Sequence, residues 1–221
     1  MNLIIQQLDK QLGGRPILAG LTLTVDQPGV VAVFGENGAG KSTLLSVLAG
    51  LLVPDRGQAT LDGASLFESK TRHLIGFVPE AADPPGHLLP DEFLALVAAL
   101  KSAPIPPPRV LELLDWPSLR GRRIGALSLG QRRRTCLAAA LCGAPPLLLL
   151  DEPTNGLDAA AVTALVQLID EQTHQGGLTL LATHDEPFAE RVHARRLRLK
   201  DGHLTAWLSS NSRRSCSDEH V

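Results

Sequence analysis

The stretch GENGAGKST, at residues 35–43, has the residue types and spacing that bind a polyphosphate. It fits the pattern GxxxxGK[ST]; a continuously apolar run at residues 30–34 precedes it, and a segment of helical periodicity follows. Its glycines let backbone N–H groups turn onto phosphate oxygens, and the helix adds the positive end of its dipole. We expect Lys41 to reach the β- and γ-phosphates and Ser42 to ligate Mg²⁺. The residues predicted to bind the nucleotide are Gly35, Glu36, Asn37, Gly38, Ala39, Gly40, Lys41, Ser42 and Thr43.

Two carboxylates and a histidine follow apolar runs further along the chain. Asp151 and Glu152 come directly after four leucines, and His184 comes soon after the apolar run at residues 178–182. Parallel strands bring their carboxyl ends to one edge of a sheet, so these side chains are expected beside the phosphate loop. Asp151 would hold Mg²⁺ through water, and the predicted catalytic residues are Glu152, which activates water, His184 and Lys41. The alternatives are a solvated carboxylate pair and a structural histidine.

A second stretch, LSLGQ at residues 127–131, opens an alanine-rich segment and also suits an anion. Ser128 can cap the helix and donate to a phosphate oxygen, while Gly130 permits close backbone approach. Three arginines follow it, and others precede it. We interpret these arginines as a solvated or subunit-facing surface rather than a nucleic-acid site. They are Arg120, Arg122, Arg123, Arg132, Arg133 and Arg134.

Composition limits the kinds of partner. The 221 residues carry a net charge of −2, which argues against a nucleic-acid partner. The cysteines Cys136, Cys142 and Cys216 show no pairing pattern, as expected of reduced thiols in a cytosolic protein. The sequence does not start like a signal peptide, and no apolar run approaches the roughly 20 residues that span a bilayer. We therefore expect any membrane role to depend on a partner.

Strand-like and helix-like segments alternate along the chain. Residues 3–8 and 21–25 alternate apolar and polar side chains, as half-buried antiparallel strands do. Residues 30–34, 147–150 and 178–182 are continuously apolar, as in strands buried on both faces; helices are expected at residues 41–52 and 159–172. The sequence thus predicts an α/β fold: a P-loop NTPase core with a mostly parallel sheet and an antiparallel β flank.

An α-helical subdomain is expected to be inserted into this core at about residues 80–143. Residues 91–101 are amphipathic, a proline-rich stretch ends that helix, and residues 110–115 and 129–141 add further helical turns. We predict one domain over residues 1–208. Residues 209–221 are polar and without periodicity, and are predicted to form a disordered tail.

Together these motifs resemble the ATP-binding-cassette (ABC) ATPase family. The specific part is the order of LSLGQ, then LLLLDEPTNGLD, then LATHD; the sequence has no NKxD guanine motif, which counts against a GTPase. The resemblance implies that two cassettes, as a homodimer or heterodimer, pack head to tail. Each signature segment would bind the ATP held by the neighbour's phosphate loop. In this chain the signature residues are Ser128, Leu129, Gly130 and Gln131.

The resemblance also implies roles for single residues. Asp158 would belong to a loop that couples the two ATP sites. Glu80, where most members carry Gln, would sense the γ-phosphate, touch the transmembrane partner and serve as a further Mg²⁺ ligand. Leu129 replaces the first glycine of LSGGQ. Leu12 stands where an aromatic ring normally stacks on adenine, so we expect adenine to be held by apolar packing alone.

We therefore predict a Mg²⁺-dependent ATPase subunit of a membrane transporter, similar to the exporter branch because of Glu80 and the overall likeness. It would lie at the cytoplasmic face of the membrane, bound through a separately encoded transmembrane permease. The alternatives are a soluble cassette that powers assembly or repair, for example of iron–sulfur type, and a nucleotide-binding regulator without turnover. Lys41, Asp151, Glu152 and His184 weaken the last.

Overall fold

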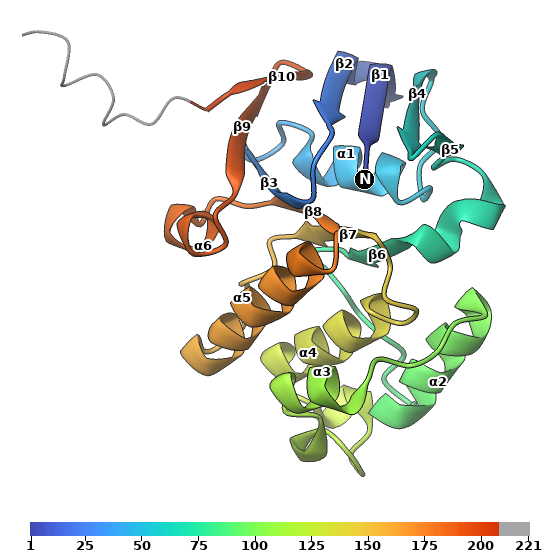
Figure 1. The fold of residues 1–221 in the computed structure, drawn as a ribbon, viewed down its shortest axis with the longest axis vertical. Coiled ribbons are helices and arrows are strands. Elements are labelled where there is room, and N and C mark those ends of the chain that lie inside the picture. The colour runs from blue at the N-terminus through green and yellow to red at the C-terminus, as the bar shows by residue number, and fades with distance from the viewer. Residues whose placement is uncertain (208–221) are drawn as a thin grey trace, which may run out of the picture.

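A six-stranded sheet forms the centre of the computed structural model, which describes residues 1–207. Its order is β10-β9-β3-β8-β7-β6, and all neighbours are parallel except β9 and β10 (Figure 1). The tail predicted at residues 209–221 lies outside the described residues. The strands are β3 (Gly29–Phe34), β6 (Ile75–Val78), β7 (Leu147–Asp151), β8 (Leu178–Ala182), β9 (Arg195–Lys200) and β10 (His203–Ala206).

A second sheet of order β2-β1-β4-β5 is antiparallel throughout and lies above the central sheet in Figure 1. The strands are β1 (Leu3–Leu12), β2 (Arg15–Val25), β4 (Arg56–Leu61) and β5 (Ala64–Ser65). The predicted combination of a mostly parallel sheet and an antiparallel flank is therefore confirmed.

Strand β3 shows why the central strands are apolar throughout. Successive side chains of a strand point to opposite faces. Val31 and Val33 pack in a core shared with the antiparallel sheet, whereas Val30, Ala32 and Phe34 pack in a second core with the helices. A strand covered on both faces has no solvent side on which to place polar residues.

The helices divide between these two cores. Helix α1 (Lys41–Leu48) packs in the first core, and α5 (Ala159–His174) packs in the second. Helix α1 is shorter than the predicted 41–52, because Gly50 adopts a φ of +71° and ends the helical path. A short 3₁₀ helix, Ser69–Leu74, precedes β6, and α6 (Glu186–Arg191) follows β8. Among the helices of residues 1–207, none combines the length and apolarity needed to cross a membrane.

Between β6 and β7 the chain forms a helical lobe, seen at the bottom of Figure 1. Lys101 joins it to the sheet, because its ammonium group donates to Ile75 O at 3.0 Å and Ala140 O at 3.2 Å. Within the lobe, the buried Trp116 donates through Nε1 to Asp91 Oδ1 at 2.7 Å. The lobe comprises α2 (Pro90–Lys101), α3 (Pro108–Leu113), α4 (Leu129–Ala140) and two 3₁₀ turns, Trp116–Ser118 and Ile124–Ala126.

Candidate nucleotide site

A cavity of about 380 Å³ opens at the carboxyl ends of the central strands. It combines the phosphate loop with residues that follow β6, β7 and β8, as parallel strands require. Most of its lining was predicted from the sequence. The lining residues are Ile17, Asn37, Gly38, Gly40, Lys41, Ser42, Thr43, Glu80, Asp151, Glu152 and His184.

The phosphate loop connects β3 to α1 through two glycines in the left-handed region. Gly38 has a φ of +81° and Gly40 a φ of +102°, which residues other than glycine rarely adopt. A Cβ atom on Gly40 would also lie 2.8 Å from Ile17 Cγ2. Gly40 is the N-cap of α1 and supplies no side-chain cap, so the first N–H groups of the helix remain available to an anion.

Lys41 is only 8 % exposed at the start of α1. Its ammonium group donates to Gly35 O at 2.8 Å and Glu36 O at 3.3 Å, which are carbonyls of its own loop. The positive charge is thus held inside the loop that would surround the phosphates.

Asp151 has a buried carboxylate oxygen that a metal ion could bind. It is 3 % exposed, and its Oδ1 atom is buried without a hydrogen-bond partner. Burial raises the pKa of Asp151; the Ser42 hydroxyl opposes this shift and the charge of Glu80 adds to it. A buried carboxylate with a free oxygen beside a hydroxyl fits Mg²⁺, which prefers oxygen ligands. Residues 1–207 contain no cluster of three His, Cys, Asp or Glu side chains that could hold a metal.

Glu152 and His184 meet at the mouth of the cavity. His184 Nδ1 lies 2.9 Å from Glu152 Oε2, and the His184 backbone N–H donates to the same oxygen at 3.4 Å. The Glu152 side chain is buried, while the His184 side chain is largely exposed. Glu152 also has a φ of +43°, an uncommon conformation that turns the chain directly after β7.

The LSLGQ segment does not line this cavity. Ser128 is the N-cap of α4, and Gln131 completes a capping box: Gln131 N–H donates to Ser128 Oγ at 3.2 Å, and Ser128 N–H donates to Gln131 Oε1 at 3.0 Å. A Cβ atom on Gly130 would collide with Gly156 O. Leu129 packs on the same glycine but is 62 % exposed. The signature segment thus rests on the loop that follows Glu152.

Some predicted residues lie elsewhere. Leu12 is at the end of β1, outside the cavity lining, and Ile17 of β2 reaches the cavity instead. Gly35 faces Leu199 O, which a Cβ atom would approach to 2.6 Å. Asp158 caps α5 by accepting from the Ala161 N–H at 2.8 Å. Nothing in the sequence pattern singled out Ile17, because its contact with the phosphate loop is long-range.

One arginine corrects the expectation of a solvated basic surface. Arg133 is 4 % exposed and donates to backbone carbonyls that include Glu80 O at 3.0 Å and Glu152 O at 2.8 Å. The neighbouring arginines behave differently: Arg132 pairs with Asp83, and Arg134 with Asp115. Because three arginines are consecutive, the sequence does not indicate which of them faces inward.

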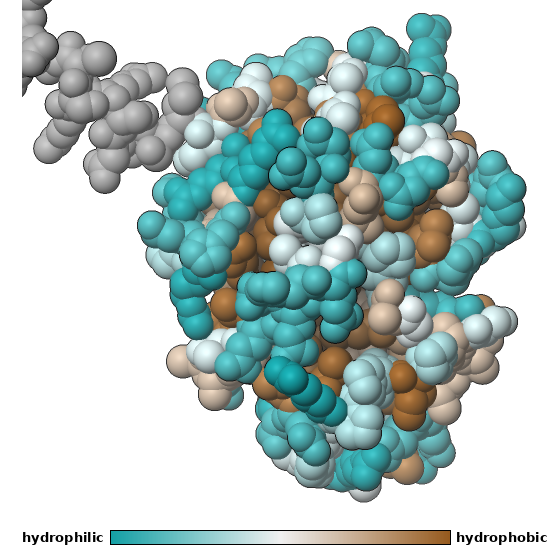
Figure 2. Space-filling view, viewed as in Figure 1, coloured by the Kyte–Doolittle hydropathy of each residue, from teal (hydrophilic) through white to brown (hydrophobic). Residues whose placement is uncertain are grey.

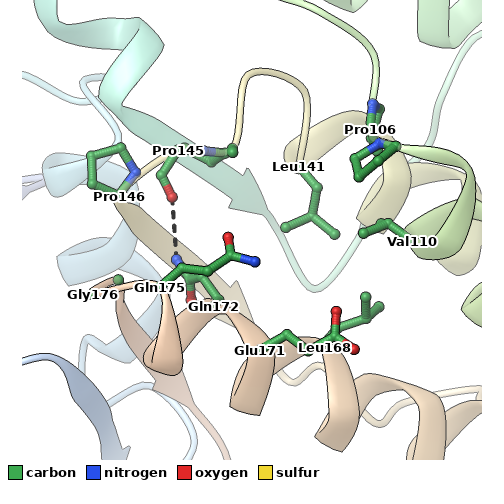
Figure 3. A pocket seen from close by; sticks show the side chains of 13 residues that line it. Pro106, Val110, Leu141, Pro145, Pro146, Leu168, Glu171, Gln172, Gln175 and Gly176 are labelled. Atoms are coloured by element: carbon green, nitrogen blue, oxygen red, sulfur yellow. Dashed lines mark hydrogen bonds between the residues drawn. The ribbon is translucent and has the colours of Figure 1, made fainter.

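A second cavity, of about 200 Å³, lies at the opposite edge, near the starts of β7 and β8. Its lining is mostly apolar, with Leu141 among the side chains that face it in Figure 3. Two of its polar side chains are engaged, because Gln172 donates to Pro145 O at 3.2 Å and Glu171 pairs with Arg109 at 2.6 Å. These groups suit phosphate poorly, so the nucleotide belongs at the first cavity.

Known proteins resemble both the sequence and this fold. The family model described as ABC transporter matches residues 18–155. The aliphatic sulfonates import ATP-binding protein SsuB of Pseudomonas putida is 38 % identical over 201 residues, covering 89 % of this chain and 72 % of SsuB. The zinc import ATP-binding protein ZnuC of Paramagnetospirillum magneticum is 38 % identical, covering 78 % of this chain and 64 % of ZnuC. The cytochrome c biogenesis ATP-binding export protein CcmA of Nitrosococcus oceani is 33 % identical, covering 88 % and 90 %.

Solved structures of ABC transporter cassettes have the same fold as this chain. A structure described as the ATP-binding subunit of an ABC transporter superposes with a TM-score of 0.85 at 28 % identity, covering 96 % of this chain and 91 % of that chain. The dimeric bacterial ABC transporter cassette MJ0796 superposes with a TM-score of 0.78 at 25 % identity, covering 94 % and 99 %. A post-hydrolysis state of MJ0796, bound to ADP and Pi, gives a TM-score of 0.77. The chain therefore belongs to the ABC transporter family, as an ATP-binding subunit that hydrolyses ATP.

Proposed function

We propose that this chain works as a head-to-tail dimer in which each ATP lies between the phosphate loop of one subunit and the signature segment of the other. One observation carries the proposal: Ser128 and Leu129 of the signature segment are exposed, and the segment lies outside its own chain's nucleotide cavity. Two copies arranged in this way would give each ATP both anion-binding segments. The dimeric arrangement of MJ0796 supports it.

Within each site we assign hydrolysis to the pair Glu152 and His184. A water oxygen attacks the γ-phosphorus, Glu152 accepts a proton from that water, and the bond to the β–γ bridging oxygen breaks to release ADP and phosphate. We assign His184 to orienting that carboxylate and contacting the γ-phosphate, because it lines the same cavity and its Nδ1 lies 2.9 Å from Glu152 Oε2. Lys41 neutralises phosphate charge, and Ser42 and Asp151 would hold Mg²⁺, which supplies further charge neutralisation.

The energy of hydrolysis would be passed to a separate transmembrane permease through an apolar groove of about 460 Å³. The groove runs between β6 and helices α2 and α4, and includes Phe77, Phe93 and Val97. Pro79 lines it, and Glu80, the next residue, lines the nucleotide cavity, so one segment borders both. Figure 2 shows apolar side chains along the junction between the sheets and the helical lobe, on a mostly hydrophilic face. A partner held here would keep the subunit peripheral, at the cytoplasmic face of the membrane.

The named relatives bear on the direction of transport. Glu80 favoured export, but the relatives do not support an exporter branch, because SsuB and ZnuC are named as import proteins. CcmA is named as an export protein. Export stays a prediction, which these import relatives disfavour.

The shared site is tested with a covalently linked pair of subunits. One subunit carries Lys41→Ala, which damages its phosphate loop, and the other carries Ser128→Arg, which damages its signature segment. If ATP is shared, the pair keeps one intact composite site, formed by the phosphate loop of the Ser128→Arg subunit and the signature of the Lys41→Ala subunit. We expect measurable phosphate release from this pair.

The control is a linked pair with both lesions in one subunit and a wild-type second subunit. In a shared arrangement, each of its two composite sites contains one lesion, and it should be inactive. If the signature served its own chain's nucleotide, the activities would be reversed: the control would be active and the test pair inactive. That reversal would refute the shared site.

The permease is tested by copurification from membranes. Val97→Asp places a charge in the groove, whereas Leu96→Asp changes the adjacent residue of α2, which is exposed and outside the groove lining. We expect a membrane protein to copurify with the wild type and with Leu96→Asp but not with Val97→Asp. Absence of a membrane partner from the wild type as well would favour the alternative of a soluble assembly cassette.

A further inference from the structure

Arg133 is the feature that the proposed hydrolysis does not use. It lies on α4, and its guanidinium group donates four hydrogen bonds, all to backbone carbonyls. One terminal nitrogen donates to Pro79 O at 2.6 Å and Glu80 O at 3.0 Å. The other donates to Asp151 O and, at 2.8 Å, to Glu152 O. A planar group with fixed donors suits this arrangement, which a lysine ammonium could not reproduce.

The four carbonyls belong to two segments of the nucleotide cavity. Pro79 and Glu80 follow β6, whereas Asp151 ends β7 and Glu152 follows it. Three of the four side chains line the cavity, so Arg133 fixes the spacing of the catalytic carboxylates from behind. It leaves those side chains free, because it binds only main-chain oxygens.

The same side chain belongs to the signature helix. Arg133 lies five residues after Ser128, which is about 7.5 Å along an α-helix. Over so short a distance the helix is stiff, so its start follows any movement of the segments that Arg133 binds. Leu129 and Gly130 press on Gly156 and hold the helix start against the same loop.

Burial of this cation is costly, which argues that it is not present for stability alone. Arg133 is 4 % exposed, and taking a charged group out of water costs free energy even when its hydrogen bonds are made. Buried charged groups can often be replaced by apolar residues of similar volume without loss of stability. A buried guanidinium here therefore indicates that Arg133 positions the segments whose carbonyls it binds.

We propose that Arg133 is a positioning residue that holds both half-sites of one chain in register: the catalytic carboxylates of its own cavity and the signature segment offered to the neighbour's ATP. This inference rests on the proposed shared site. It predicts that one side chain serves two different nucleotides.

The linked pair described above separates the two roles, because its single working site takes the phosphate loop from one subunit and the signature from the other. Arg133→Met is placed in either subunit in turn, and kcat and KM for ATP hydrolysis are measured. We expect kcat to fall about tenfold or more from either position, with KM changed less than threefold, since misplacement by about 1 Å can cost 10²-fold. Arg134→Met is the matched control, because its ion pair with Asp115 stays within the helical lobe, and it should change kcat less than threefold.

Each other result overturns the inference in a recognisable way. A loss only in the subunit with the intact phosphate loop would confine Arg133 to its own cavity. A loss only in the subunit with the intact signature would confine it to the neighbour's site, and no loss in either would remove the role. An inactive parent pair would instead contradict the shared site, before Arg133 is changed. If thermal melting shows that the Arg133→Met variant is not folded, Arg133→Lys is used in its place. The expected outcome and the outcomes that contradict the inference stay the same.

Discussion

The amino-terminal ends of α1 and α4 both have the composition of anion sites, yet they are built in opposite ways. Helix α1 begins at Gly40, which supplies no side-chain cap, so its first N–H groups stay open. Helix α4 begins at Ser128, where a capping box with Gln131 already occupies two of the donors. A helix leaves about four N–H groups without internal partners, so a cap reduces what remains for a ligand.

The difference assigns different tasks to the two ends. The end of α1 also has Lys41, whose ammonium group lies inside the phosphate loop, and Ser42 and Asp151, which would hold the Mg²⁺ that accompanies a polyphosphate. At the end of α4 the Ser128 oxygen accepts a hydrogen bond within the cap, which leaves its hydroxyl hydrogen to donate outward. Such an end adds to a ligand that is already held. We therefore propose that the phosphate loop of one chain binds ATP and that the signature segment of the other chain completes the site.

The first prediction separates chemistry from binding at the α1 site. Glu152→Gln removes the proton acceptor but leaves the phosphate loop intact. Phosphate release should fall by on the order of 10²–10⁴-fold, while ATP affinity, measured by equilibrium dialysis, stays within threefold. Turnover close to that of the wild type would remove Glu152 from its role.

The second prediction concerns the buried carboxylate of Asp151 at the same site, whose Oδ1 atom has no hydrogen-bond partner. Asp151→Asn replaces a buried carboxylate by a neutral amide of similar size, and the raised pKa of Asp151 indicates that burial disfavours its charged form. The nucleotide-free variant should melt at a higher temperature than the wild type, although its Mg²⁺-dependent hydrolysis is lost.

The pH dependence of that difference follows from the sign of the shift. A raised pKa means that the folded wild type loses stability as pH rises from the unfolded value, 3.8, through the folded value. The gain from Asp151→Asn should therefore grow over this range and then level off. A melting temperature of the variant below that of the wild type at neutral pH would show that the carboxylate stabilises the empty site.

The third prediction tests the cap of α4. Ser128→Ala removes the side-chain acceptor of the capping box and should lower the free energy of unfolding by about 1 kcal/mol, measured by urea denaturation. ATP binding by the separated subunit should not change, because Ser128 lies outside its cavity. Weakened ATP binding by a monomer would erase the proposed contrast between the two helix ends.

The smallest effect is expected at the base of the nucleotide. We expect the phosphate loop to supply most of the binding, because Ile17 is the apolar side chain that lines the cavity and Leu12 lies outside it. Among residues 1–207 no Phe, Tyr or Trp side chain lines the cavity, and aromatic stacking is worth about 0.5–1.5 kcal/mol beyond buried area. In competition assays ATP and GTP should bind within about tenfold of each other. A preference for ATP above roughly a hundredfold, about 2.7 kcal/mol, would reveal a further adenine contact.

Much of this architecture could be predicted because the signals are local. A buried strand, a glycine-rich loop and a helix start follow one another at residues 30–48, and the rule for parallel strands then places Asp151 and His184 at the same edge. Arg133 and Ile17 could not be found in this way. Their roles depend on contacts between segments far apart in sequence, and the neighbours of Arg133 are also arginines.

The contact between Gly130 and Gly156 restricts what evolution can do at the signature segment. Any side chain at Gly130 collides with a carbonyl of the same chain, whether or not a second subunit or a nucleotide is present. Purifying selection would therefore retain this glycine even in a descendant that had lost dimerisation. Invariance at Gly130 is weak evidence of an ATP contact, and drift at Ser128 would be the more informative trace of a cassette that has stopped sharing its nucleotide.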